Sequence, residues 1–249
     1  MKHSKVPRSG APAWTVFPDL EPPEPGGSVT IPRLAHKRPE AIPSARAIKL
    51  DHGQVKATTL SFNNMNDYGN LLANYLRARK ETFIDKLHWN LPEADGMEFD
   101  QYDNPFCRWI ILHEFGEVLG GVRLTPTTAK CGLYSYMLRD AQRGILDNIP
   151  DDVLFFEAPV EERVWEASRL FISESVPAKR RADVQNILMN QMSIAAHEAG
   201  ATQVIGIVPA VWSRWLRRLG LDAVPVGPSF SIDGTKSQSA LFPVSKYIN

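Results

Sequence analysis

The sequence predicts a mixed α/β fold in which helices cover both faces of a β-sheet. The run VWEASRLFI at 164–172 is rich in strand formers and apolar on both alternating faces, as in a central strand covered on both sides. Residues 182–199 are apolar at helical spacing, and the short apolar run 201–208 follows them. Strand and helix therefore alternate along the folded part of the chain.

Local sequence signals also predict a helix and two strands before the central strand. Residues 67–84 are expected to form a helix, with Asn64 or Asn66 available as its N-cap. Residues 108–126 have the pattern of two strands around a turn at Gly116.

The later elements are indicated by glycines and by alternation. The helix at 182–199 is expected to end at Gly200, and a last helix is expected at 212–220. On an ideal strand, one face of the segment 164–172 carries Trp165, Ala167 and Phe171.

Composition narrows the class of protein. Hydrophobic residues make up 43% of the 249 residues and charged residues 22%, which is ordinary for a globular protein. Lys plus Arg and Asp plus Glu number 28 each, so no basic excess points to a nucleic-acid partner. No apolar run approaches the roughly 20 residues of a membrane span. Without a signal-peptide pattern, the two cysteines, Cys107 and Cys131, favour a reducing cytoplasm.

The N-terminal segment differs from the rest of the chain. Nine of the 19 prolines fall within residues 1–50, where aliphatic residues are sparse and no helical or strand period is found. We expect 1–50 to be a Pro-rich, disordered extension and 51–249 to be the folded domain.

Charged residues stand at positions that the pattern marks as buried. Arg123, Glu166 and Arg169 lie inside expected strands. Further charges from other segments bring the total to three arginines and three carboxylates, the others being Arg79, Asp100 and Asp103. Buried charges must pair, because losing a partner costs on the order of 3–5 kcal/mol.

Two interpretations of this group of charges fit the spacing equally. An ion-pair network that only supports the fold is one. A binding site for a cationic or zwitterionic ligand is the other, because the aromatic residues Phe83 and Trp89 stand nearby in sequence. The histidines His88, His113 and His197 lack the spacing of metal ligands, so no metal site is predicted.

The segment RKETFIDKLHWNL…EFDQYD at 79–103 resembles the signature of the LuxI-type acyl-homoserine-lactone synthases. That signature is an Arg, a Phe four residues later, a basic residue (here Lys86), a Trp, and then Glu-x-Asp-x-aromatic-Asp. The resemblance continues through GGVRLTPT at 120–127 and VWEASRLF at 164–171, and it covers roughly residues 60–245.

The resemblance implies a fold and an activity. The fold is expected to be a GNAT-like three-layer αβα sandwich with a mixed, twisted sheet and a cleft where strands splay. The family transfers a fatty acyl group from acyl carrier protein, or in some cases coenzyme A, to the amine of S-adenosylmethionine. The methionine carboxylate then closes the lactone and expels methylthioadenosine, so S-adenosylmethionine is a substrate and no cofactor is expected.

Two other functions remain open beside the synthase. The chain would alternatively be a diverged, non-catalytic relative that binds S-adenosylmethionine or acyl carrier protein as a regulatory partner. A GNAT-like enzyme that acylates another amine is a third possibility, which the intact signature disfavours.

The resemblance also implies roles for single residues. Glu166 is predicted as the base that deprotonates the amine, with Arg169 orienting the site. On an ideal strand these two side chains point to opposite faces, so they pair directly only across a bulge or twist. Arg79 or Arg123 is predicted to bind the substrate carboxylate. The sulfonium and ammonium groups are assigned to Asp100, Asp103, Phe83 and Trp89.

The acyl pocket departs from the family pattern at two places. Pro209 stands where members that make 3-oxo signals usually carry Thr, so unsubstituted or 3-hydroxy chains are expected to be preferred. Ser135 or Ser168 would alternatively replace the missing donor. The pair Ile149-Pro150 stands where many members have Phe-Pro, so no ring is expected there.

The acyl donor is predicted to be a carrier protein, because the GNAT pyrophosphate loop is absent near 177–183. Basic residues suited to an acidic carrier occur in two clusters, although solvated charged faces explain them equally well. These residues are Lys179, Arg180, Arg181, Arg214, Arg217 and Arg218.

Overall fold

A computed structural model describes residues 46–50, 53–209, 223–232 and 234–244. The helix predicted at 212–220, with Arg214, Arg217 and Arg218, and the first 45 residues of the predicted extension lie outside the described residues. The strands are β1 (Arg46–Leu50), β2 (Gly53–Leu60), β3 (Glu93–Ala94), β4 (Met97–Glu98), β5 (Arg108–Glu114), β6 (Glu117–Pro126), β7 (Val164–Ile172), β8 (Gln203–Pro209), β9 (Val224–Ile232) and β10 (Thr235–Pro243). The helical elements are η1 (Met65–Tyr68), α1 (Leu71–Lys80), the π-helix η2 (Glu81–Lys86), α2 (Met137–Gln142) and α3 (Ala178–Glu198).

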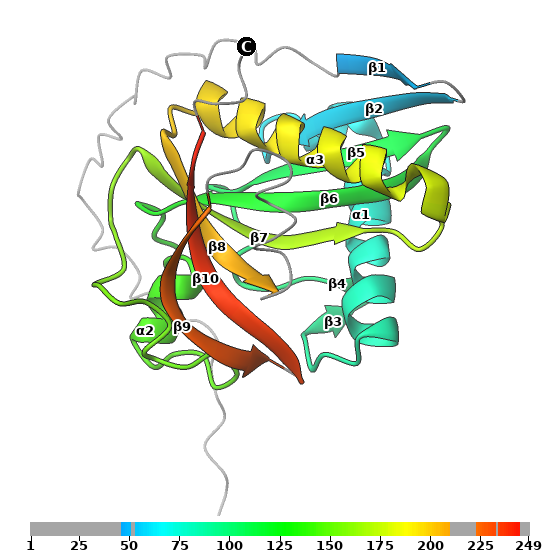
Figure 1. Cartoon of the computed structure of the whole chain (residues 1–249). Coiled ribbons are helices and arrows are strands. Elements are labelled where there is room, and N and C mark those ends of the chain that lie inside the picture. The colour runs from blue at the N-terminus through cyan, green and yellow to red at the C-terminus, as the bar shows by residue number, and fades with distance from the viewer. Residues whose placement is uncertain (1–45, 51–52, 210–222, 233, 245–249) are drawn as a thin grey trace, which may run out of the picture. The chain divides into compact units, whose positions relative to one another are not determined.

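Eight of the strands form one mixed sheet in the order β1-β2-β5-β6-β7-β8-β10-β9 (Figure 1). Neighbouring strands are antiparallel except β7 and β8, which are parallel and are joined through α3. A parallel pair needs such a crossover, because its second strand must start again at the same end of the sheet. The predicted alternation of strand and helix over 164–208 is confirmed.

Helices cover both faces of this sheet. α3 packs its buried residues, among them Val184, Leu188 and Met192, against one face. α1 packs on the opposite face around Tyr75 and Leu76, and α2 lies on that second face too, where Leu138 contacts the cluster around Ile205. The predicted mixed α/β architecture with three layers is confirmed.

The helix expected at 67–84 is interrupted. Gly69 has φ +56° and separates η1 from α1, and after Lys80 the chain continues as the π-helix η2 to Lys86. Asn64 does take the N-cap position, but that of the short helix η1, and its side chain makes no cap bond there; its Oδ1 accepts the Ser61 N–H instead.

The remaining differences lie at the ends of elements and in short elements. β1 lies inside the segment predicted as a disordered extension and pairs with β2. α3 begins four residues before the predicted start, and it ends as predicted at Gly200, whose φ is +88°. The turn between β5 and β6 is at Gly116, φ +89°, as predicted.

Strand β7 contains a bulge that changes which residues face which helix. Gly121 pairs with Phe171 and Arg123 with Ser168, so two residues of β7 oppose one residue of β6. Arg169, at φ +54°, is the first of these two. Ala167 faces α3 but Phe171 faces α1, so the prediction that they share a face was wrong, because the bulge shifts the alternation by one residue.

β7 and β8 separate just before this bulge. They pair only from Val164–Gln203 to Ala167–Gly206, after which β7 pairs with β6 alone and β8 with β10. At the last pair the backbones are close, since a Cβ on Gly206 would lie 2.5 Å from the carbonyl oxygen of Ala167. A gap between two sheet strands therefore opens beyond this point.

Among the described residues, no helix is both long and apolar enough to cross a membrane.

Candidate active site

A buried ionic cluster lies between α1 and the sheet. Arg79 donates from Nη1 and Nη2 to Asp103 (2.7 and 3.0 Å) and also pairs with Glu98. Arg123 donates from Nη1 and Nη2 to Asp100 (2.5 and 3.2 Å), and its Nη1 lies 3.0 Å from Asp103 Oδ2. The two guanidinium groups therefore share the carboxylate of Asp103.

Arg169 is the third arginine of this cluster and bonds two of its carboxylates. Its Nε donates to Glu98 at 3.1 Å and its Nη2 to Asp100 at 2.9 Å. Three arginines thus face three carboxylates, as predicted, but the third carboxylate is Glu98 and not Glu166. Glu98 belongs to the short strand β4, which contacts α1, and it was not among the predicted site residues.

The pairing keeps the cluster ionised in spite of its burial. Burial would raise the pKa of Asp100, but Arg123 and Arg169 outweigh this effect and hold the pKa below its usual value. For Asp103 burial is likewise outweighed, by Arg123 and Arg79, so its pKa is also lowered. Both groups are therefore carboxylates at neutral pH and are weak proton acceptors.

Glu166 lies outside this cluster and serves a different contact. Its side chain is fully buried, and its two oxygens accept the backbone N–H groups of Met137 (3.0 Å) and Leu138 (2.7 Å) at the start of α2. Burial raises the pKa of Glu166 to about 7, although these two hydrogen bonds oppose the shift. The bulge that would let Glu166 pair with Arg169 exists, but Arg169 turns to Glu98 and Asp100 instead.

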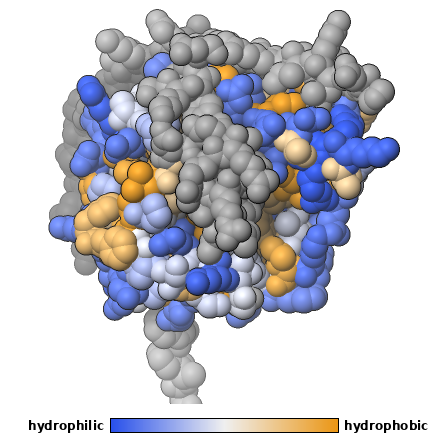
Figure 2. Space-filling model, viewed as in Figure 1, coloured by the Kyte–Doolittle hydropathy of each residue, from blue (hydrophilic) through white to orange (hydrophobic). Residues whose placement is uncertain are grey.

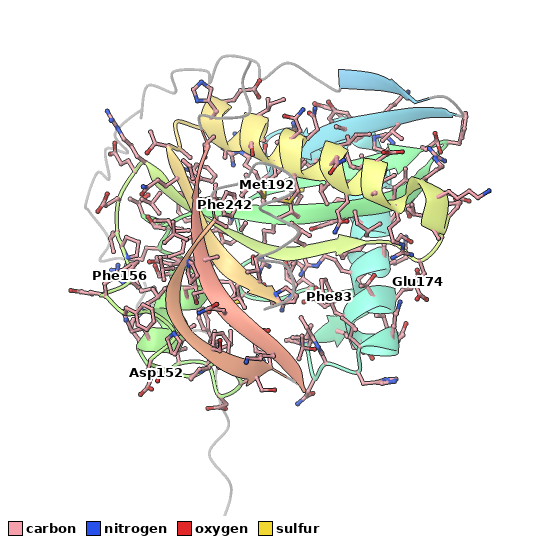
Figure 3. The ribbon with its side chains drawn as sticks, in the orientation of Figure 1. Phe83, Asp152, Phe156, Glu174, Met192 and Phe242 are labelled. Atoms are coloured by element: carbon pink, nitrogen blue, oxygen red, sulfur yellow. The ribbon has the colours of Figure 1, made fainter. Side chains whose placement is uncertain are left out.

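A cavity of about 770 Å³ opens where β7 and β8 separate. Its walls come from both faces of the sheet: η2 and β7 contribute Phe83 and Phe171 on the α1 side, and α3 contributes Met189 and Met192 on the other. Figure 3 labels three of its lining residues, Phe83, Met192 and Phe242, which come from three different elements. The cavity therefore connects the two faces of the sheet at the point where the strands part.

The polar wall of the cavity is formed by the accessible edge of the ionic cluster. Asp100 and Arg169 both line the cavity, and the Arg169 side chain is 9% exposed. Phe83 stacks on Trp89 with ring centroids 5.0 Å apart, and the Arg169 guanidinium lies 5.8 Å from the Phe83 centroid. The predicted site residues Phe83, Trp89, Asp100 and Arg169 are thus brought together at one wall.

Three other predicted binding residues stand behind this wall. The side chains of Arg79, Asp103 and Arg123 are fully enclosed, and none of the three is among the described residues that line the cavity. Their polar atoms are already bonded to one another, to Trp109 and to Ser168. The direct contacts of Arg79 or Arg123 with the substrate carboxylate, and of Asp103 with the substrate cation, therefore stay predictions, and this enclosed geometry does not favour them.

Glu166 is also buried, and it lies outside the described lining of the cavity. Of the described residues, its neighbours Met137 and Ala167 line the cavity and Glu166 does not. The geometry accordingly does not support Glu166 as a base in direct contact with a ligand.

The other wall of the cavity is apolar. It includes Leu170 and Ile172 of β7 and Met189 and Met192 of α3. Ile149, in the loop after α2, also lines the cavity but belongs to the cluster on the opposite face of the sheet. Pro209, the predicted acyl-pocket residue, also lines the cavity, at the end of β8 and opposite Ser237 of β10. Ser135 does not contribute to the described lining and donates its hydroxyl to the carbonyl of Ala129 at 3.0 Å, whereas Ser168 lines the cavity.

The predicted docking residues differ from one another in their surroundings. Arg180 donates two hydrogen bonds to Glu114, at 2.9 and 3.2 Å, so its charge is already paired. Arg181 reaches two backbone carbonyl groups near the start of α3, whereas Lys179 is exposed.

The exposed apolar surface nearby belongs to a different region. Phe155 and Phe156, in the loop between α2 and β7, are 70% and 43% exposed. Figure 3 labels Phe156, and Figure 2 shows hydrophobic surface on the same side of the molecule. Neither phenylalanine lines the cavity, so this surface is not part of the candidate site. Within the described residues, no group of histidine, cysteine or acidic side chains is arranged to hold a metal ion.

Comparison with known sequences gives a family match over most of the chain. The autoinducer synthase family matches residues 63–248. An acyl-homoserine-lactone synthase from Ralstonia solanacearum is 34% identical over 170 residues, which cover 66% of this chain and 76% of that protein. An acyl-homoserine-lactone synthase from Pseudomonas aeruginosa is 26% identical, covering 70% of this chain and 79% of that protein.

Solved structures agree with the fold. TofI, in a ternary complex with an inhibitor and MTA, is 26% identical with a TM-score of 0.60, covering 77% of this chain and 92% of that one. The acyl-homoserine-lactone synthase LasI has a TM-score of 0.65 at 20% identity, covering 78% of this chain and 92% of that one.

Proposed function

This chain belongs to the autoinducer synthase family, and we propose that its cavity holds S-adenosylmethionine and a fatty acyl thioester together. It is an acyl-homoserine-lactone synthase, an acyltransferase that makes N-acyl-homoserine lactone from S-adenosylmethionine and an acyl donor. One observation supports the proposed arrangement most directly: the cavity has a polar, aromatic wall on one face of the sheet and an apolar wall on the other.

S-adenosylmethionine fits the polar wall by its charges. Its ammonium and sulfonium groups are positive, and Asp100 offers a carboxylate at the wall. The rings of Phe83 and Trp89 present aromatic faces to a cation. The carboxylate of the substrate is assigned to the guanidinium of Arg169, which replaces the earlier assignment to Arg79 or Arg123.

The relative TofI was solved in complex with MTA, which supports binding of this group by a protein of the same fold. We take MTA to be methylthioadenosine, the product that remains of S-adenosylmethionine once the lactone has formed.

The acyl chain is assigned to the apolar wall. Leu170, Ile172, Met189 and Met192 remove the chain from water, and each buried methylene contributes about 0.8 kcal/mol. The reacting carbonyl then lies where β7 and β8 separate, between the two walls. There the substrate amine attacks it, and the substrate carboxylate afterwards displaces methylthioadenosine from its own γ-carbon.

Glu166 is proposed as a positioning residue. By accepting the N–H groups of Met137 and Leu138 it fixes the start of α2, and Met137 lines the cavity. A missing side chain at this position would leave α2 without its anchor on β7, and an amide would keep only one of the two acceptor oxygens.

The acyl donor is proposed to be acyl carrier protein rather than acyl coenzyme A, on the sequence pattern at 177–183. The cytoplasm is the proposed location, because both cysteines are free thiols and the carrier is a cytoplasmic protein class.

The proposed function is tested with purified protein, S-adenosylmethionine and either acyl carrier protein or coenzyme A thioesters. Mass spectrometry should find both acyl-homoserine lactone and methylthioadenosine, in equal amounts and faster with the carrier thioester. Binding of S-adenosylmethionine without either product would instead identify a non-catalytic relative. Acylation of an added amine with no lactone would identify a different acyltransferase.

The same assay tests the role of Pro209. A proline at the cavity wall has no side-chain donor for a 3-oxo oxygen, and a buried carbonyl without a donor costs about 1–3 kcal/mol. In competition between equal amounts of unsubstituted and 3-oxo donors, the unsubstituted lactone should dominate. A pool made mainly of 3-oxo lactone would contradict this assignment.

A further inference from the structure

Ser168 stands at the point of the cavity where the sheet divides. It follows Ala167, the last residue of β7 that pairs with β8, and it precedes the bulge residue Arg169. It lines the cavity, yet it is 5% exposed, so its hydroxyl has almost no access to solvent outside that space.

The hydroxyl oxygen of Ser168 already accepts one hydrogen bond. Arg123 Nε donates to it at 3.1 Å. The other donors of this fully buried guanidinium are held by Asp100 and Asp103, so its orientation is fixed. The Ser168 oxygen is thereby committed as an acceptor, and its hydrogen is directed elsewhere.

That hydrogen has no acceptor among the described residues. Of the other described hydroxyl groups in the cavity wall, three donate to the protein: Thr82 to the carbonyl of Ala78, Tyr102 to Asp140, and Ser237 to the carbonyl of Thr235. The fourth, that of Thr235, belongs to a half-buried residue, whereas Ser168 is buried. Ser168 is thus a buried donor that faces the cavity and still lacks its partner.

The charge behind Ser168 makes it a strong donor toward an anion. Arg123 is fully buried and permanently protonated, and its Nε–H polarises the hydroxyl oxygen that it contacts. A group with this arrangement stabilises negative charge that develops on an oxygen atom 2.7–3.1 Å away.

We propose that Ser168 is a catalytic residue, whose hydroxyl donates a hydrogen bond to the thioester carbonyl oxygen and to the oxyanion formed when the amine attacks. The proposal deepens the proposed function and rests on it. In this proposal Arg123 has two roles: it pairs with Asp100 and Asp103, and it makes the Ser168 hydroxyl a stronger hydrogen-bond donor without contacting the substrate.

The step is balanced without any further reactant. The lone pair of the amine nitrogen forms the C–N bond while the C=O π pair moves to oxygen, where Ser168 donates its hydrogen bond. When the C=O bond forms again, the C–S bond breaks and its electron pair leaves with the thiolate. The proton released by the nitrogen ends on that sulfur as a thiol.

The central test replaces the hydroxyl. Ser168→Ala should lower kcat by about 100-fold or more, the size typical for removing one oxyanion donor, with KM for S-adenosylmethionine changed less than about threefold. Ser168→Thr restores a hydroxyl and should recover most of the rate. Ser193→Ala is the matched control, since Ser193 is buried in α3, donates to the carbonyl of Met189 and is not among the described lining residues.

Thermal unfolding of each variant keeps the test independent of folding, because Ser168→Ala leaves the Arg123 Nε–H without its acceptor. If that variant does not fold, Ser168→Cys retains an acceptor for Arg123 but donates weakly, and the same loss of kcat is expected.

Two acyl donors separate the proposal from the alternative that Ser168 serves a 3-oxo substituent. A loss of rate with both unsubstituted and 3-oxo donors supports a bond to the reacting carbonyl. A loss confined to the 3-oxo donor overturns the proposal, as does a folded Ser168→Ala protein with wild-type kcat. If the wild type itself makes no lactone, the proposed function fails and Ser168 is not at issue.

Discussion

Arg123 and Arg169 share the carboxylate of Asp100, but one lies inside the protein and the other lies at the wall of the cavity. Arg123 is enclosed by Asp100, Asp103 and Ser168, whereas Arg169 leaves part of its guanidinium accessible beside Phe83. Identical residue types in one cluster therefore serve two purposes. The enclosed Arg123 holds Asp100 in position, whereas Arg169 remains accessible to a ligand in the cavity.

The largest expected effect comes from breaking the enclosed part. Arg123→Met leaves Asp100 with one arginine partner, Arg169. It also removes one of the two arginine partners of Asp103, and both carboxylates are buried away from solvent. The free energy of unfolding should fall by about 3–5 kcal/mol, as measured by urea denaturation. Asp85→Asn, which breaks an exposed pair with Lys80, should cost less than about 1 kcal/mol. Equal losses in the two variants would contradict the comparison.

Removing the accessible arginine should affect binding more than stability. Arg169→Met deletes the cation proposed to bind the substrate carboxylate, and a hydrogen bond to a charged group is worth about 1.5–3 kcal/mol. KM for S-adenosylmethionine should rise by roughly 10- to 150-fold, with KM for the acyl donor nearly constant. A variant that loses stability as Arg123→Met does, but binds S-adenosylmethionine normally, would place Arg169 with the enclosed residues.

Glu166 offers a test by pH, because its side-chain hydrogen bonds within the described part of the chain come from two uncharged backbone N–H groups. Its pKa is raised to about 7 by burial, while in the unfolded chain it is near 4.5, the usual value of a glutamic acid. Between about pH 4.5 and pH 7, Glu166 is therefore protonated in the folded state and ionised in the unfolded state. The stability associated with this proton is complete below about pH 4.5 and is lost as pH rises to about 7, by at most about 1.4 kcal/mol per pH unit.

Glu166→Gln removes this titration and changes the contact to α2. An amide has one oxygen, so its NH₂ group would face the N–H of Met137 or Leu138, at a cost of about 1–3 kcal/mol. Urea unfolding at pH 5 and pH 8 should show a smaller pH dependence in the variant than in the wild type. The same pH dependence in both would show that Glu166 is not the titrating group.

The smallest effect is expected at the proposed docking surface. Arg180 is paired with Glu114, so the exposed Lys179 is the better test of attraction to an acidic carrier. Lys179→Glu should raise KM for acyl carrier protein by about two- to fivefold at low salt and hardly at all at high salt. Lys130→Glu, at another exposed lysine, is the control; an equal rise there would point to net charge and not to docking.

The comparison also shows which parts of the structure were open to prediction. Local sequence signals predicted the turn at Gly116, the strand at 164–172 and the end of α3 at Gly200. These signals are the two glycines, which adopt positive φ in the structure, and the apolar periodicity. α2 has six residues and β9 contains Pro225 and Pro228, so neither has a clear period. β9 tolerates its prolines because it lies at the edge of the sheet.

The site was predictable as a set of residue types but not as a set of contacts. The balance of three arginines and three carboxylates followed from the cost of burying charge. Which carboxylate completes the set depended on the bulge at Arg169, which turns this side chain away from Glu166 and toward Glu98. Glu98 stands in EFDQYD beside Asp100, and its alternation with that residue was the available signal.

The contact between Glu166 and α2 has a consequence for the order in which the chain folds. α2 is far shorter than the 12–15 residues that a helix needs to persist by itself, and no side chain caps its N-terminus from within the segment. The carboxylate that secures it comes from a strand 28 residues further along the chain. We therefore expect α2 to form only after β7 has docked, so the amide hydrogens of Met137 and Leu138 should become protected from exchange late in refolding.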